Sequence, residues 1–186
     1  EREAMSDEEM TAYLAQCVID PKAPRPSIET LLHAFLPFKH VDLTHPDAII
    51  SLCCADNGRE LAREIFGDRF VWVPYIRPGF ALSKMIAQGV RENSQARLVL
   101  MEKHGLVTWG ETSEECYHNT ISVIQEAERF IEARVNPETL FGGRMAETLN
   151  REARRKLLAE VMPVIRGAVS GDKTMILAYD DGDDVL

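Results

Sequence analysis

The chain has 186 residues, with 21 basic and 30 acidic side chains and a net charge of −9. Its length fits one domain with a single sizeable core, and its 45% hydrophobic and 27% charged content excludes wholesale disorder. An acidic balance without a basic stripe argues against nucleic acid as a partner. No apolar run reaches about 18 residues, and the first residues lack the apolar core of a signal peptide. We therefore expect a cytoplasmic protein without a membrane partner.

The four cysteines are Cys17, Cys53, Cys54 and Cys116. Adjacent Cys53 and Cys54 point in different directions on a helix, and no pair has the spacing of a zinc ribbon or a disulfide-rich fold. We expect reduced and mostly buried thiols.

Hydrophobic periodicity and capping residues predict the elements of the first half of the chain. In chain order they are a helix over 6–17, a proline-rich extended segment over 20–26, a helix capped by Ser27 and stopped by Pro37, a strand over 40–45, a helix after Pro46, a helix over 58–66, a strand over 70–73 and a helix over 80–90.

The second half begins with an apolar strand over 97–102, and Gly105 permits a bend before its hairpin partner over 106–109. The remaining predictions are a helix over 112–134, a break at Pro137 and Gly142-Gly143, a helix over 150–166, a last strand over 175–178 and an acidic tail over 180–184. This alternation of helices and short strands favours a three-layer α/β/α unit. Without an obvious linker, we expect a single domain over 1–186.

Two of the five histidines, His45 and His104, each follow a predicted strand. Strand ends that are far apart in sequence are easily adjacent in a sheet, and neutral imidazole is a good ligand for zinc and similar divalent ions. Each histidine taken alone is more typical of a hydrogen-bonded structural role than of a metal ligand. The pattern therefore indicates a possible metal site.

Acidic side chains close to these elements allow two interpretations. Glu29 lies in the first turn of a predicted helix, where it either interacts with the helix dipole or serves as a general acid and base beside a metal-bound carbonyl. Asp42 either orients His45 or faces solvent.

Other catalytic patterns are missing from the sequence. No glycine-rich dinucleotide loop follows a strand, Gly142-Gly143 lacks the spacing of a phosphate cradle, and no serine or cysteine has the setting of a nucleophile elbow.

Three ordered segments carry a family resemblance: PSIETLLH at 26–33, HVDLTHPDA at 40–48 and EKHGLVTWG at 102–110. Together with VPYIRPGF at 73–80, they resemble the class II aldolase/adducin family. The likeness is closest to the aldolase domains of bifunctional rhamnulose-1-phosphate aldolase/alcohol dehydrogenases, and it covers most of the chain.

The resemblance implies an α/β/α fold with a central, mainly antiparallel sheet, usually assembled as a homo-tetramer. It also implies zinc held by three histidines, of which His45 matches the second and His104 the third, with Glu29 as the acid/base carboxylate. The implied reaction cleaves a ketose 1-phosphate, a small phosphorylated sugar, into dihydroxyacetone phosphate and an aldehyde.

The sequence departs from the family pattern at two places. The first ligand histidine falls at Leu43, which has no ligand atom, and His40 lies an odd number of strand positions away, on the opposite face. The Gly-Asn-x-Ser phosphate-binding segment is also missing, so we expect a domain truncated at its N-terminus. Two alternatives therefore stay open: a sugar-phosphate epimerase, and a metal-impaired, non-catalytic assembly domain of adducin type.

Overall fold

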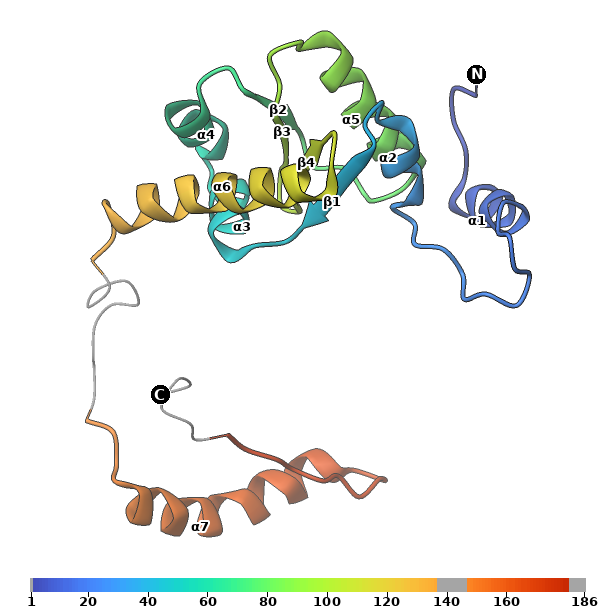
Figure 1. Ribbon diagram of the computed structural model, residues 1–186. Helices are drawn as coiled ribbons and strands as arrows, with labels where there is room; N and C mark the ends of the chain where they lie inside the picture. Colours follow the sequence, from blue (N-terminus) through green and yellow to red (C-terminus); the bar gives the residue numbers. More distant parts are fainter. Residues whose placement is uncertain (1, 137–146, 181–186) are drawn as a thin grey trace. The chain divides into compact units, whose positions relative to one another are not determined.

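The computed structural model describes residues 2–136 and 147–180 (Figure 1). The chain divides into two compact units, residues 1–135 and 136–186. The first unit contains α1 (Asp7–Gln16), α2 (Thr30–Phe35), β1 (His40–Thr44), α3 (Asp47–Cys54), α4 (Gly58–Phe66), β2 (Phe70–Val73), α5 (Phe80–Glu92), β3 (Leu98–Met101), β4 (Gly105–Gly110) and α6 (Ser113–Glu132). The second contains α7 (Arg151–Ser170). The single domain expected over 1–186 stays a prediction.

The four strands form one mixed sheet in the order β1-β4-β3-β2. β4 runs antiparallel to both β1 and β3, whereas β2 and β3 run parallel. This corrects the expectation of a mainly antiparallel sheet. The physical reason is the connection: a tight turn joins β3 to β4 and reverses the chain, while α5 carries the chain from β2 back to the start of β3.

Side chains alternate between the two faces of the sheet and build a core on each. The core under α2 and α5 includes Leu32, Ile86, Val99 and Val107. The core under α3, α4 and α6 includes Ile49, Phe66, Leu98, Leu100 and Val123. Because each face of the sheet is covered by helices, the α/β/α layering expected from the sequence is confirmed.

A smaller apolar cluster joins α1 to the rest of the first unit. Met10 and Leu14 of α1 pack with Leu31 of α2 and Phe80 of α5. The capping box expected at the start of α1 is present, because Ser6 and Glu9 exchange hydrogen bonds.

The second helix begins later than expected. Ser27 does not cap it: the Ser27 hydroxyl accepts the Glu29 backbone N–H at 3.1 Å, in a turn that precedes the helix. Glu29 itself is the N-cap residue of α2 and makes no side-chain capping bond there.

The second unit consists of α7 and the residues around it. Asn150 caps α7 by accepting the Ala153 N–H at 2.9 Å. The strand expected over 175–178 does not form, since residues 174–180 have no regular secondary structure and no strand in the described part of the chain pairs with them. The break at Pro137 and Gly142-Gly143, and the acidic tail beyond Asp180, lie outside the described residues.

All four cysteines are free thiols. Cys53 and Cys116 are buried as expected, but Cys17 and Cys54 are exposed. Among the described residues, no helix is both long enough and apolar enough to cross a lipid bilayer.

Candidate metal centre

The sheet register brings the two strand-end histidines together. His45 follows β1 directly, and His104 lies in the turn between β3 and β4. Because β1 and β4 are antiparallel, with Thr44 opposite Leu106, the end of β1 meets the beginning of β4. The His45 and His104 rings are stacked, with centroids 5.2 Å apart and planes at 10°. The expected proximity of these two side chains is therefore present in the structure.

Gly105 allows this close approach. A Cβ atom at Gly105 would lie 2.6 Å from the Thr44 carbonyl oxygen and 3.0 Å from Cδ2 of His45. Both distances are too short for a side chain, so only glycine lets the start of β4 lie against the end of β1.

The turn that carries His104 is held in a specific conformation. Lys103 has a φ of +55°, which is uncommon for a residue other than glycine, and its backbone N–H donates to the Cys53 carbonyl at 3.0 Å. Cys53 belongs to α3, the helix that begins just after His45. One hydrogen bond therefore links the segments that carry the two histidines.

Glu29 completes the group from the start of α2. Its Oε1 lies 3.2 Å from Nε2 of His104, and the two side chains are 27% and 13% exposed. One ligand atom from each of Glu29, His45 and His104 lies within 4.8 Å of the others. Within the described residues, this is the one cluster of three histidine, cysteine or acidic side chains that could hold an ion.

The donor set fits a divalent metal. Two ligands that each bind one ion at about 2.1 Å can be at most about 4.2 Å apart, so the three donor atoms need only small movements to share an ion. Two imidazole nitrogens and one carboxylate oxygen are donors that zinc and related divalent ions accept. The low exposure of His104 and Glu29 strengthens their attraction to a cation relative to the same groups in bulk water.

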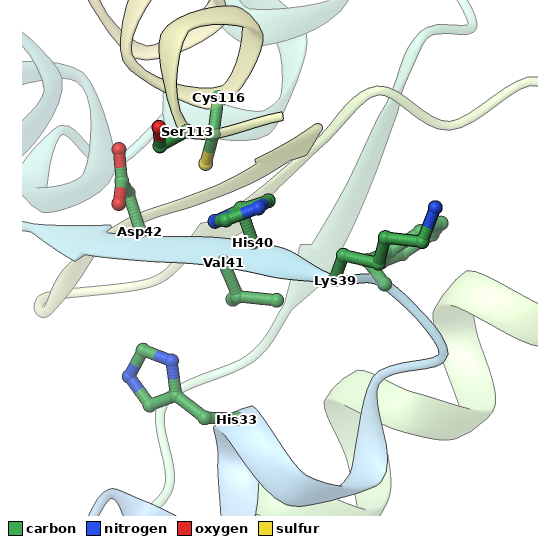
Figure 2. A pocket seen from close by; sticks show the side chains of 8 residues that line it. His33, Lys39, His40, Val41, Asp42, Ser113 and Cys116 are labelled. Atoms are coloured by element: carbon green, nitrogen blue, oxygen red, sulfur yellow. The ribbon is translucent and has the colours of Figure 1, made fainter. Parts of the chain in front are cut away.

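Leu43 and His40 do not belong to this group. The Leu43 side chain is partly buried and packs against the core under α2 and α5. His40 lines a separate cavity of about 320 Å³, and Figure 2 shows it on the same side of β1 as Asp42 and Cys116. The prediction that His40 does not replace the missing histidine agrees with this placement.

Asp42 does not orient His45; it is half-buried and lines the same cavity as His40. Its Oδ2 accepts the Thr120 hydroxyl at 3.1 Å, and Thr120 also shares a 2.6 Å hydrogen bond with Thr108. Asp42 thus ties β1 to α6 on the face opposite Leu43. It makes no hydrogen bond that orients His45.

Sequence reasoning placed Glu29 beside the two histidines through the family resemblance, but it missed the direct hydrogen bond between Glu29 and His104 and the left-handed Lys103. The first joins residues 75 positions apart, and no local pattern encodes it. The only sequence signal for the second is Gly105, which marks a bend at this place without locating the strained residue.

Comparison with known proteins places most of the chain in one family. The family described as Class II Aldolase and Adducin N-terminal domain matches residues 2–131. The N-terminal class II aldolase domain of a conserved protein from Thermoplasma acidophilum is 40% identical, with a TM-score of 0.63. That match covers 69% of this chain and 59% of the other.

A curated relative aligns with the whole length of the chain. The Bacillus subtilis (strain 168) protein named "Uncharacterized oxidoreductase YuxG" is 68% identical over 185 residues. This match covers 100% of the chain but only 27% of the relative, so the chain spans about a quarter of that protein's length.

Proposed function

Because the chain belongs to the Class II Aldolase and Adducin N-terminal domain family, we propose that it is a metal-dependent aldolase module, an aldehyde-lyase. The proposed substrate is a ketose 1-phosphate similar to rhamnulose 1-phosphate, and the proposed products are dihydroxyacetone phosphate and an aldehyde. The observation that carries the proposal is that one ligand atom from each of Glu29, His45 and His104 lies within 4.8 Å of the others.

His45 and His104 are the proposed metal ligands, and Zn²⁺ is the proposed ion. A divalent ion bound there would polarise the sugar carbonyl and stabilise negative charge on its oxygen. Low exposure of His104, and the turn that holds it, fix one donor in place before substrate arrives. This rigidity supports a preorganised site.

Glu29 is the proposed general acid and base. Its carboxylate lies beside both histidines and is more exposed than His104, so it can contact a substrate bound between them. As base it accepts the proton of the hydroxyl group next to the carbon–carbon bond that breaks. As acid it returns a proton to the carbon of the three-carbon product.

The comparisons support the wider setting of this proposal. Class II aldolases typically depend on divalent metals, and family members are generally oligomers that bind small sugar phosphates. We propose that the protein forms a homo-oligomer, namely the tetramer that the family resemblance implies. We also propose that it is located in the cytoplasm. The word oxidoreductase in the name of the Bacillus subtilis relative is compatible with an aldolase module, because 73% of that protein lies outside the match.

Leu43 favours one alternative, an assembly domain with impaired metal binding. Its side chain packs against the core at the position where the resemblance implies a ligand histidine. The centre therefore has two imidazoles instead of the three that the resemblance implies. A sugar-phosphate epimerase would use the same three side chains to break the same kind of carbon–carbon bond, but it would re-form that bond with the opposite configuration at one carbon instead of releasing two products.

The substitution Glu29→Gln tests the proposed role. It keeps the shape of the side chain but removes the proton acceptor, so cleavage of rhamnulose 1-phosphate should fall about a hundredfold or more. Dihydroxyacetone phosphate release would be measured by a coupled assay, and bound metal by elemental analysis. Metal content should stay unchanged, because His45 and His104, and not Glu29, are the proposed ligands.

The matched control is Glu114→Gln, which changes a highly exposed carboxylate on α6 and should leave turnover unchanged. Undiminished cleavage by the Glu29→Gln protein would reject the acid/base role. Absence of cleavage in the unmodified protein, together with a stable oligomer, would favour the assembly domain.

A further inference from the structure

A second cavity lies away from the metal centre, between the N-terminal segment, α1, α2 and α5. Its volume is about 400 Å³, which is within the range of small-molecule sites. None of its lining residues belongs to the Glu29–His45–His104 group.

Aromatic and aliphatic side chains form one wall of this cavity. The rings of Phe35 and Phe80 meet edge to face, with centroids 6.0 Å apart, and Leu31 lies beside them. Leu31 and Phe80 belong to the cluster that attaches α1, so this wall is part of a packed core. Such a wall suits a flat apolar group, and an aromatic ring gains edge or stacking contacts there.

The charged residues in the lining are all cationic within the part of the chain that the structure describes. Arg2, Lys84 and Arg91 line the cavity, and no acidic residue of ranges 2–136 and 147–180 does, although the whole chain carries a net charge of −9. Within residues 2–136 and 147–180, neither arginine forms an ion pair. Three positive side chains that have no ion-pair partner among the described residues therefore line one cavity.

Lys84 shows how the cavity is built. Its ammonium donates to the backbone carbonyls of Arg2 at 3.2 Å and Glu3 at 3.1 Å, and it lies 5.6 Å from the centre of the Phe80 ring. These bonds hold the N-terminal segment against α5. They use two of the three ammonium donors, so one donor and the full charge remain for a ligand.

We propose that this cavity binds a small aromatic anion, with the ring against Phe35 and Phe80 and a phosphate or carboxylate group facing Arg2, Lys84 and Arg91. Guanidinium groups recognise both kinds of anion through paired N–H donors. An anion bound there would also neutralise charges that otherwise repel one another. The site is independent of the proposed aldolase chemistry.

Titration calorimetry with phenyl phosphate tests this proposal. The protein is kept in a chelator, so that no metal at Glu29, His45 and His104 can hold the phosphate. We expect saturable binding of one phenyl phosphate per chain. Inorganic phosphate, which lacks the ring, and benzyl alcohol, which lacks the charge, should each bind about tenfold more weakly or worse.

Two variants and a matched control locate the binding. Arg91→Gln removes an exposed cation of the cavity and should weaken phenyl phosphate binding about tenfold. Tyr13 of α1 also lines the cavity and is 52% exposed, and Tyr13→Ser should weaken binding as well. Arg59→Gln, at an exposed position of α4, should change nothing. Three results would each overturn the proposal. The first is no measurable binding of phenyl phosphate, and the second is that inorganic phosphate or benzyl alcohol binds as tightly as phenyl phosphate. The third is that Arg91→Gln and Arg59→Gln change the binding equally.

Discussion

At the scale of single residues, Leu43 and His45 show how strand alternation limits the metal centre. The Val41 and Leu43 side chains pack against the core under α2 and α5, and strand alternation continued by one residue beyond β1 would turn position 45 to the same side. A histidine at position 43 would therefore project from the same face as His45. It would lie two residues before His45, next to the pair formed by His45 and His104.

Leu43→His is expected to raise zinc binding from substoichiometric to nearly one ion per chain, because it adds a third imidazole to the centre. Elemental analysis of the purified proteins measures this. Val41→His is the matched control, because position 41 lies on the same face of β1 as position 43 but two residues farther from His45. This substitution should not raise the zinc content. Equal and negligible zinc in all three proteins would count against a zinc site here.

Residue burial also separates the four thiols. Burial raises the pKa of Cys53 from its ordinary 9.0 to about 12 and that of Cys116 to about 11. We expect Cys17 and Cys54 to react quickly with a disulfide reagent at pH 8, and Cys53 and Cys116 only on unfolding. Cys54→Ser should remove one fast thiol, whereas Cys53→Ala should remove none; fast labelling of all four would contradict the buried positions.

The same pKa values predict how stability changes with pH. The folded protein keeps a proton on Cys53 that the unfolded chain releases above about pH 9, so the free energy of unfolding should fall as pH rises from 9 to 12. Below pH 9 both states hold this proton, and Cys53 should contribute no slope. Cys53→Ala should reduce the slope in the alkaline range.

At the scale of elements, the turn from β3 to β4 decides the geometry of the centre. It places His104 between a left-handed Lys103 and a glycine that touches the end of β1. Neither neighbour supplies a ligand. Both set the distance between the two imidazole rings.

Gly105→Ala should therefore lower stability by about 1–3 kcal/mol and weaken metal binding, because its Cβ would push against the Thr44 carbonyl and the His45 ring. Thermal unfolding and zinc titration measure the two effects. Gly167→Ala in α7 is the control: no atom lies within 4 Å of its Cβ position, and alanine is the better helix former. If the two substitutions had the same effect, the turn would not control the centre.

Elements that depend on local signals were predicted well from the sequence. The 58–66 helix and the 70–73 strand have the expected bounds, and the capping box before α1 is present. Before α6 only half of the expected capping box forms: Thr112 accepts the Glu115 N–H, but the Glu115 carboxylate accepts the Glu111 N–H. The start of α2 was predicted wrongly, because Ser27 can satisfy the Glu29 N–H in a turn as readily as in a helix cap. The strand expected over 175–178 has an apolar sequence, but a strand needs a partner as well as a pattern.

At the scale of the whole molecule, the first unit contains all four strands, both sheet cores and the candidate centre. The family match at residues 2–131 covers nearly the same part of the chain. The adjacency of His45 and His104 was predictable, because strand ends meet across a sheet. The direction of β2 and the contact between Glu29 and His104 were not, because both depend on how distant segments pack.

The most direct test of the account is zinc affinity, measured by titration against a competing chelator in the unmodified protein and in His104→Ala. We predict that His104→Ala weakens zinc binding about tenfold or more, since it removes one of the donors that converge with Glu29 and His45. His118→Ala, at an exposed histidine of α6, should leave the affinity unchanged. Identical affinities in all three proteins would contradict a metal centre at this place.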